Sequence, residues 1–121
     1  MVSYFFDTYA LIEIMKNNPN YIKFIDENIT TAKFNLAELI YAAIMENGEG
    51  FAKSIFDRFR GAEIEVSDDV LFKAMTFRFK NKKKNLSYAD CIGYVFAEEN
   101  GLKFLTGDEA FRNMANVVFV K

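Results

Sequence analysis

Short apolar runs alternate along the chain with longer segments in which apolar residues recur every three or four positions. Residues 2–6, VSYFF, form the first run, which ends at Asp7 and predicts a buried strand. Apolar residues then recur at helical spacing, at Ala10, Leu11, Ile14 and Met15. Residues 17–18 end this helix, and Pro19 suits the first turn of a second helix that we expect to reach about Glu27.

A long helical region follows the second predicted strand. Thr30–Phe34, TTAKF, is strand-like, and Asn35 is then expected to cap a helix. The core face of that helix carries Leu36, Leu39, Ile40, Ala43 and Ile44. Gly48 and Gly50 punctuate its end, and a further helix is predicted over roughly 51–60.

The third strand is predicted at Glu63–Val66. Residues 67–69, Ser-Asp-Asp, then form a good helix start, and the helix continues through Phe79. Residues 81–85, NKKKN, are polar and basic and predict a loop. Ser87 starts another helix, whose inward face carries Cys91, Ile92, Val95 and Phe96.

Two more strands complete the predicted set, at Lys103–Thr106 and Val117–Val120, after an Asn100-Gly101 helix end. Strands that alternate with helices imply right-handed crossovers and a parallel sheet covered on both faces. The predicted fold class is therefore α/β, as a three-layer α/β/α domain. With 121 residues and no repeat or linker, residues 1–121 are expected to form one domain.

Residue content excludes several classes of site. The formal net charge of −2 gives no overall basic footprint, so contact with RNA or DNA requires a local patch. The absence of histidine excludes Ser-His and Cys-His catalysis and histidine-ligated metals. The single cysteine, Cys91, excludes an intrachain disulfide and a multi-cysteine zinc site, and its apolar neighbours favour a core position.

Targeting and membrane signals are not evident in the sequence. No apolar run approaches the ~20 residues that a membrane span requires. The first ten residues, MVSYFFDTYA, lack the basic region and long apolar region of a signal peptide. We therefore expect a cytoplasmic protein that has no membrane segment.

Four acidic residues occupy places where a parallel sheet forms ligand sites. Ligands bind beyond the carboxyl ends of the strands in such sheets. Asp7 ends the first strand, Asp108 follows the fourth, and Glu38 lies in the first helical turn after the second. Asp90 lies in the first turn of the helix that leads into the fourth strand, so it joins the others if that helix starts near the same edge.

Each acid also has a structural interpretation. The two acids at helix starts stand three residues after Asn35 and Ser87, as in capping boxes, where they satisfy backbone N–H groups. Asp108 fits a plain turn after a glycine. Asp7 is harder to explain in this way, because an apolar strand rarely ends in a carboxylate without a partner.

Crowded carboxylates with no nearby base either hold protons or require a cation. Mg²⁺ or Mn²⁺ fits such a site because hard cations prefer oxygen ligands. A metal-bound water is more acidic, and the ion stabilises charge on phosphoryl oxygens. Thr8 and Thr106 flank the predicted pocket, either as ordinary turn and strand residues or as groups that orient a carboxylate or water.

Three segments in this order resemble the PIN domain, and specifically the VapC-type toxins of toxin–antitoxin pairs. They are FFDTYALIE (5–13), FNLAELIYA (34–42) and LSYADCIGYVFAEENGLKFLTGDEAF (86–111). The last is the most specific, because it joins an acid-plus-apolar helix start, the helix end, and a strand that runs into T-x-D-x-x-F. The resemblance covers essentially the whole chain.

The resemblance implies a parallel sheet in the order 3-2-1-4-5 and a Mg²⁺- or Mn²⁺-dependent endoribonuclease. By matching position, Asp7, Glu38, Asp90 and Asp108 form its acidic quartet, and Thr106 is the hydroxyl before the last acid. Three of the acids would hold the ion, while Glu38 would orient or deprotonate the attacking water, or bind a second ion. An antitoxin protein, an RNA substrate and a homodimer are the implied partners.

Some residues leave alternatives open. Tyr9 stands where related proteins often have a small polar residue, and it either packs or lines the site. Glu109 either helps to bind metal or starts the next helix, and the second interpretation is simpler. The basic cluster, which is Arg78, Lys80, Lys82, Lys83 and Lys84, is either a solvated loop or a phosphate-binding rim.

Two other functions are considered. A PIN-like interaction module would bind a protein partner with little turnover. An α/β phosphohydrolase or phospho-acceptor domain is the other. A DxD nucleophile motif fails because Tyr9 stands at its second acidic position, and a phospho-acceptor residue after the third strand would be Asp68 or Asp69, which are explained more simply by a helix start.

Overall fold

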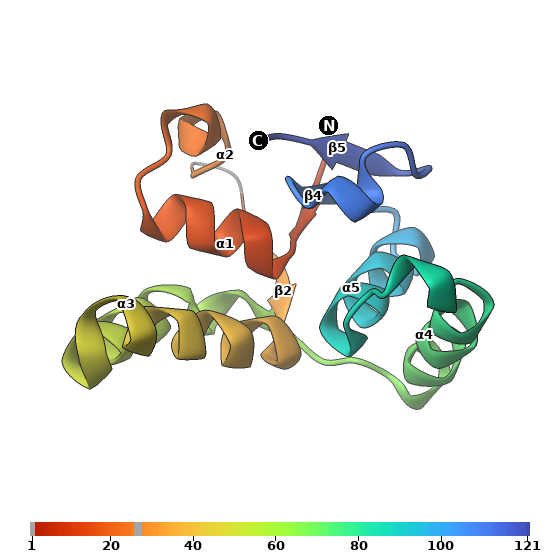
Figure 1. Ribbon diagram of the computed structural model, residues 1–121, viewed down its shortest axis with the longest axis horizontal. Coiled ribbons are helices and arrows are strands. Elements are labelled where there is room, and N and C mark those ends of the chain that lie inside the picture. The colour runs from red at the N-terminus through yellow and green to blue at the C-terminus, as the bar shows by residue number, and fades with distance from the viewer. Residues whose placement is uncertain (1, 26–27) are drawn as a thin grey trace.

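Parallel strands form the centre of the molecule in the computed structural model, which describes residues 2–25 and 28–121 (Figure 1). The strands are β1 (Tyr4–Phe6), β2 (Thr31–Ala32), β3 (Glu63–Ile64), β4 (Lys103–Thr106) and β5 (Val117–Phe119). They pair in the order β1-β4-β5 in one sheet and β2-β3 in another. A single parallel bridge between Phe5 and Thr30 joins the two sheets. These neighbours agree with the predicted order 3-2-1-4-5, although one bridge replaces a continuous ladder between β2 and β1.

Helices cover the strands on both sides (Figure 1). They are α1 (Thr8–Met15), α2 (Ile22–Ile25), α3 (Lys33–Phe59), α4 (Asp68–Lys80) and α5 (Tyr88–Glu99). Short 3₁₀ turns lie between them: η1 (Pro19–Tyr21), η2 (Arg60–Ala62), η3 (Lys82–Lys84) and η4 (Glu109–Phe111).

The two faces of the sheet bury different cores because successive side chains of a strand point in opposite directions. Phe6 and Leu105, which are paired across β1 and β4, pack with α1, α2 and α3. Phe5 and Phe104, the neighbouring pair, pack with α4 and α5. The predicted three-layer α/β/α arrangement is thereby confirmed.

The sequence prediction was wrong about where β2 ends and α3 begins. The strand covers only Thr31–Ala32, and the helix starts at Lys33 with Ala32 as its N-terminal neighbour. Asn35 therefore lies inside the helix and does not cap it, so the predicted capping box with Glu38 is absent. The predicted end near Gly48 is confirmed as a kink, because Asn47 and Gly48 leave helical geometry within α3.

Other predicted boundaries agree closely with the structure. Ser67 caps α4 through the N–H of Val70, which confirms the interpretation of residues 67–69 as a helix start. Ser87 caps α5 in a complete capping box with Asp90. The helix ends at Glu99 with Asn100 as its C-terminal cap, and the following Gly101 has a positive φ of 69°. Lys82–Lys84, predicted as loop, form one 3₁₀ turn.

The predicted second helix is present as η1 followed by α2. Pro19 lies in the first turn, as expected, and Asn18 caps it through the N–H of Asn20. The predicted end near Glu27 lies outside the described residues. Across the part of the chain that the structure describes, no helix combines the length and apolar character needed to span a bilayer.

Candidate metal-binding active site

Asp7 occupies the junction between β1 and α1. Its backbone follows the strand, and its Oδ1 accepts a hydrogen bond of 2.8 Å from the N–H of Ala10, so the carboxyl caps α1. The residue is only 1% exposed. Burial raises the pKa of Asp7 from 3.8 to about 8, although hydrogen bonds from Thr106 and Ala10 act in the opposite direction. The Asp7 carboxylate is therefore ionised at neutral pH only when something compensates its charge.

Asp90 lies in the first turn of α5, as predicted. Its Oδ2 accepts a 3.0 Å hydrogen bond from the N–H of Ser87, and its own N–H donates to Ser87 Oγ. Burial raises the pKa of Asp90 despite these bonds, and the charges of Asp108 and Glu38 raise it further. Asp90 is therefore both a cap and a member of an acidic group, so the two interpretations of it are compatible.

Asp108 follows β4 and caps η4. Its Oδ1 accepts from the N–H of Ala110, and its own N–H donates to Thr106 Oγ1 at 3.0 Å. Thr106 is fully buried behind the acids, where it contacts both Asp7 and Asp108. Only glycine fits at position 107 of this turn, because a Cβ there would collide with the ring of Tyr9 and the carbonyl oxygen of Val120.

Glu38 comes from the second turn of α3, one turn later than predicted, because the helix begins at Lys33. Its side chain is exposed, in contrast to that of Asp7. Its Oε1 accepts a short hydrogen bond of 2.6 Å from the hydroxyl of Thr8, at the start of α1. A contact between residues 30 positions apart thus links Glu38 to the residue that follows Asp7.

All four acids line one open cleft of about 660 Å³ at the carboxyl edge of the strands. Its walls comprise Asp7, Thr8, Tyr9, Ile12, Ala37, Glu38, Tyr41, Ser87, Asp90 and Asp108. Among residues 2–25 and 28–121, no three acidic or cysteine side chains lie close enough, as they stand, to form a ligand set for a metal ion. The acids therefore share a cleft but are not arranged in coordination geometry.

The chemistry of the cleft nevertheless fits a hard divalent cation. Every predicted ligand is a carboxylate, and oxygen ligands are those that Mg²⁺ and Mn²⁺ prefer. Each hydrogen bond described above is accepted by one oxygen of its carboxylate. The other oxygen of each carboxylate is therefore left to bind an ion. The acids are also close enough for the charges of Asp90 and Asp108 to raise the pKa of Asp7. A cation would remove this repulsion and favour the ionised form.

Three residues in or next to the cleft either had two alternative predicted roles or were not predicted. Tyr9 both lines the cleft and packs on Gly107, and Lys121 Nζ lies 5.5 Å from the centre of its ring. Glu109 starts η4 and pairs with Arg112 at 3.0 Å, which agrees with the simpler prediction. Tyr41 was missed, although its position three residues after Glu38 places it on the same helix face.

The basic cluster covers the last turn of α4 and the connection from α4 to α5. Lys82–Lys84 are exposed, whereas Arg78 is partly used within the fold. Arg78 Nε donates to the carbonyl of Leu86 at 2.9 Å, and its guanidinium lies 4.6 Å from the centre of the Tyr88 ring. The cluster therefore leads directly into Ser87, which lines the cleft.

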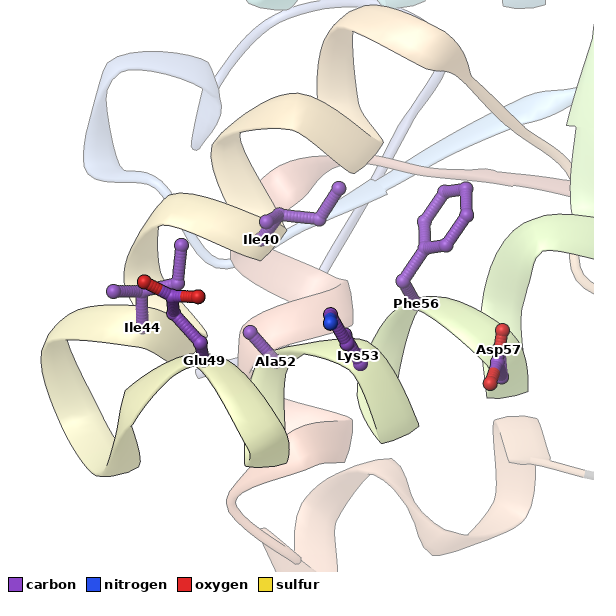
Figure 2. A pocket seen from close by; sticks show the side chains of 7 residues that line it. All are labelled: Ile40, Ile44, Glu49, Ala52, Lys53, Phe56 and Asp57. Atoms are coloured by element: carbon purple, nitrogen blue, oxygen red, sulfur yellow. The ribbon is translucent and has the colours of Figure 1, made fainter.

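A second pocket, of about 330 Å³, lies in the bend of α3 (Figure 2). Ile40 and Ile44 from the first half of the helix face Ala52 and Phe56 from the second half. Its charged residues, Glu49, Lys53 and Asp57, are of mixed sign, and none of the four predicted acids lines it. It offers no set of carboxylates comparable with that of the acidic cleft.

Comparison with known proteins defines the family. A sequence model of the PIN domain matches residues 4–117. A comparison with curated proteins finds no match.

Three solved structures show how similar the fold is. VapC20 from Mycobacterium tuberculosis, described as a sarcin–ricin loop cleaving toxin, has a TM-score of 0.78 at 17% identity, with 98% of this chain and 99% of that chain covered. VapBC2 from Rickettsia felis, bound to a promoter DNA fragment, gives 0.73 at 20% identity, with 99% and 98% covered. A toxin–antitoxin complex from Klebsiella pneumoniae gives 0.70 at 20% identity, with 96% of each chain covered. Because the family match spans nearly the whole chain and the fold agrees with it, this chain belongs to the PIN domain family.

Proposed function

We propose that the protein is a Mg²⁺- or Mn²⁺-dependent endoribonuclease that hydrolyses phosphodiester bonds in RNA, and that it is the toxin of a type II toxin–antitoxin pair. The observation that carries the proposal is the cleft itself. It gathers four carboxylates from four separate elements, and one of them, Asp7, is buried without a cationic partner among the described residues. Metal-assisted hydrolysis explains why a fold would retain such an arrangement.

The residues take distinct roles in this proposal. Asp7, Asp90 and Asp108 would hold the ion directly or through water, and Glu38 would orient or deprotonate the attacking water, or bind a second ion. When bound, the ion lowers the pKa of a coordinated water and stabilises charge on the phosphoryl oxygens. Thr106 fixes Asp7 and Asp108 through its hydroxyl. In-line attack would leave a 5′-phosphate and a 3′-hydroxyl.

The comparisons support the choice of substrate and partner. VapC20 is described as cleaving the sarcin–ricin loop, and the Klebsiella structure is described as a toxin–antitoxin complex. By analogy, we infer an RNA substrate and an antitoxin protein for this chain.

Dependence on a divalent ion tests the proposal. Purified protein is expected to cut single-stranded or structured RNA when Mg²⁺ or Mn²⁺ is present and to stop when excess EDTA is added. Gel analysis of end-labelled RNA, with end-group determination, measures the rate and the product ends. Equal cutting with and without EDTA would contradict the metal role, and no cutting under any condition would leave only a binding function.

The basic cluster is expected to contact RNA phosphates beside the cleft. Replacing Lys82, Lys83 and Lys84 by Gln removes three positive charges. If each contacts one phosphate, the slope of log K against log salt becomes less negative by roughly 2. Fluorescence anisotropy with a labelled RNA at several salt concentrations measures this change. A control with Lys23→Gln and Lys53→Gln, exposed lysines on other elements, should keep the wild-type slope, and an unchanged slope in the triple variant would refute the contact.

An interaction module is the second candidate, and exposed apolar residues favour a protein partner in either case. Large apolar side chains are exposed on α3 and α4, at Phe34, Tyr41, Ile44, Met45, Leu71, Phe72 and Phe79. Exposed apolar side chains mark a site of protein association where they gather into a contiguous patch. Both an antitoxin and a homodimer fit them, and light scattering of the purified chain distinguishes a dimer from a monomer. The module differs from the nuclease in predicting partner binding with no RNA cleavage.

A further inference from the structure

We propose that Asn35 is a positioning residue that acts through the hydroxyl of Thr8 to orient the carboxylate of Glu38 in the cleft. This inference rests on the proposed function, because it assigns the hydrogen-bond chain a purpose in the nuclease reaction. Asn35 does not line the acidic cleft, and the sequence suggested only a helix-capping role for it.

A continuous chain of hydrogen bonds joins the three residues. Asn35 is fully buried in the first turn of α3, and its Nδ2 donates to Thr8 Oγ1 at 3.2 Å. The Thr8 hydroxyl donates in turn to Glu38 Oε1 at 2.6 Å. Asn35 and Glu38 are three residues apart on one helix face, and Thr8 on α1 bridges them.

The direction of these bonds matters because a threonine hydroxyl has a single proton to donate. If that proton pointed to Asn35, Glu38 would lose its donor. The Asn35 amide N–H occupies an acceptor position of the Thr8 oxygen, so the hydroxyl proton is left for Glu38. Asn35 thereby selects one of two orientations of Thr8, and Thr8 holds an otherwise exposed carboxylate.

The arrangement leaves one polar atom without a partner. Within the described residues, Asn35 Oδ1 is buried and accepts no hydrogen bond. A buried acceptor without a partner destabilises a fold. An apolar residue of similar size would avoid this cost, so stability alone does not explain asparagine here. A loss of stability that accompanies a gain in site geometry is typical of functional positions.

The first variant is Asn35→Leu, which keeps the number and branching of the side-chain heavy atoms and removes both polar atoms of the amide. If Asn35 orients Thr8, this variant is expected to cut RNA about tenfold more slowly through kcat, with an unchanged or higher melting temperature. A residue needed only for packing would give the opposite result, with loss of stability and with activity lowered only as far as the protein unfolds. Wild-type kcat in a folded Asn35→Leu protein would overturn the proposal.

Variants of Thr8 and Glu38 test whether the effect passes through the hydroxyl. Thr8→Val removes the proton and is expected to lower kcat at least as much as Asn35→Leu, while Thr8→Ser keeps the hydroxyl and should restore most of the rate. In a Glu38→Gln background, Asn35→Leu should cause little further loss, because residues that act in series are not additive. If the losses of kcat from Asn35→Leu and Glu38→Gln were additive, Asn35 would not act through Glu38 and the proposal would be overturned. Thr76→Val is the control, since the Thr76 hydroxyl bonds to the Phe72 carbonyl within α4, a helix that contributes no residue to the cleft.

Crystal structures of the wild-type and Asn35→Leu proteins give a readout that needs no activity. The expected difference is that Thr8 Oγ1 turns away from Glu38 Oε1 in the variant or that the Glu38 side chain adopts more than one conformation. An unchanged Thr8–Glu38 bond in the variant would overturn the proposal whatever the kinetics. If the wild type cuts no RNA but the bond is lost in the variant, the proposed nuclease function fails while the positioning role of Asn35 stands.

Discussion

Asp7→Asn is expected to reduce RNA cleavage by roughly 10³-fold, which corresponds to the several kcal/mol that a metal ion contributes to a transition state. The substitution removes one negative charge and leaves the size of the side chain unchanged. Asparagine is also a good N-terminal cap, so the bond to the Ala10 N–H is retained and α1 should keep its start. The loss is therefore expected in catalysis and metal binding, and not in folding.

Cleavage assays at saturating Mg²⁺ measure this effect, and a Mn²⁺ titration by calorimetry measures the expected loss of affinity. Asp68→Asn is the matched control, because Asp68 is an exposed acid in the first turn of α4, away from the cleft. It should leave both quantities unchanged. Full activity in folded Asp7→Asn protein would remove Asp7 from the site.

Asp7 is also expected to make the metal-free protein less stable as the pH rises. Its pKa is about 8 in the folded chain, against 3.8 as its ordinary value. Between these values the folded state holds a proton that the unfolded state has released, so the free energy of unfolding falls with increasing pH. The accumulated loss is on the order of 4 kcal/mol at pH 7. The raised pKa of Asp90 acts in the same direction, and the chain has no histidine to titrate in this range.

Urea unfolding between pH 5 and pH 8, in EDTA, measures this dependence. Asp7→Asn should flatten most of it and should be more stable than wild type at pH 8, because the amide resembles the protonated acid. Mg²⁺ should stabilise the wild type more at pH 8 than at pH 5, since the ion replaces a proton on the carboxyl. An equally steep pH dependence in Asp7→Asn would show that Asp7 does not hold the proton.

The sheet and the approximate position of the site could be predicted because both follow from local patterns. An apolar run that ends in Asp7, and another that ends shortly before Asp108, place both acids at the carboxyl edge of neighbouring parallel strands. Ser87 was predicted as a cap from its spacing to Asp90, and the structure has the complete capping box.

The start of α3 could not be predicted because tertiary contacts there override local preference. Asn35 is a favourable cap by residue type, but its side chain bonds to Thr8 from inside the helix. The contact joins residues 27 positions apart, which no local pattern reveals. The degree of burial of Asp7, and hence its raised pKa, likewise depends on how β1, α1 and β4 pack together.

Diffraction from crystals grown with Mn²⁺, analysed by its anomalous signal, tests the central claim most directly. The account predicts a peak in the acidic cleft, about 2.2 Å from oxygens of Asp7 and at least one of Asp90 and Asp108, which rotate toward it. A water between the ion and Glu38 would further support the proposed role of Glu38. Crystals in which Mn²⁺ binds elsewhere, or in which the four carboxylates remain apart at saturating Mn²⁺, would contradict the account.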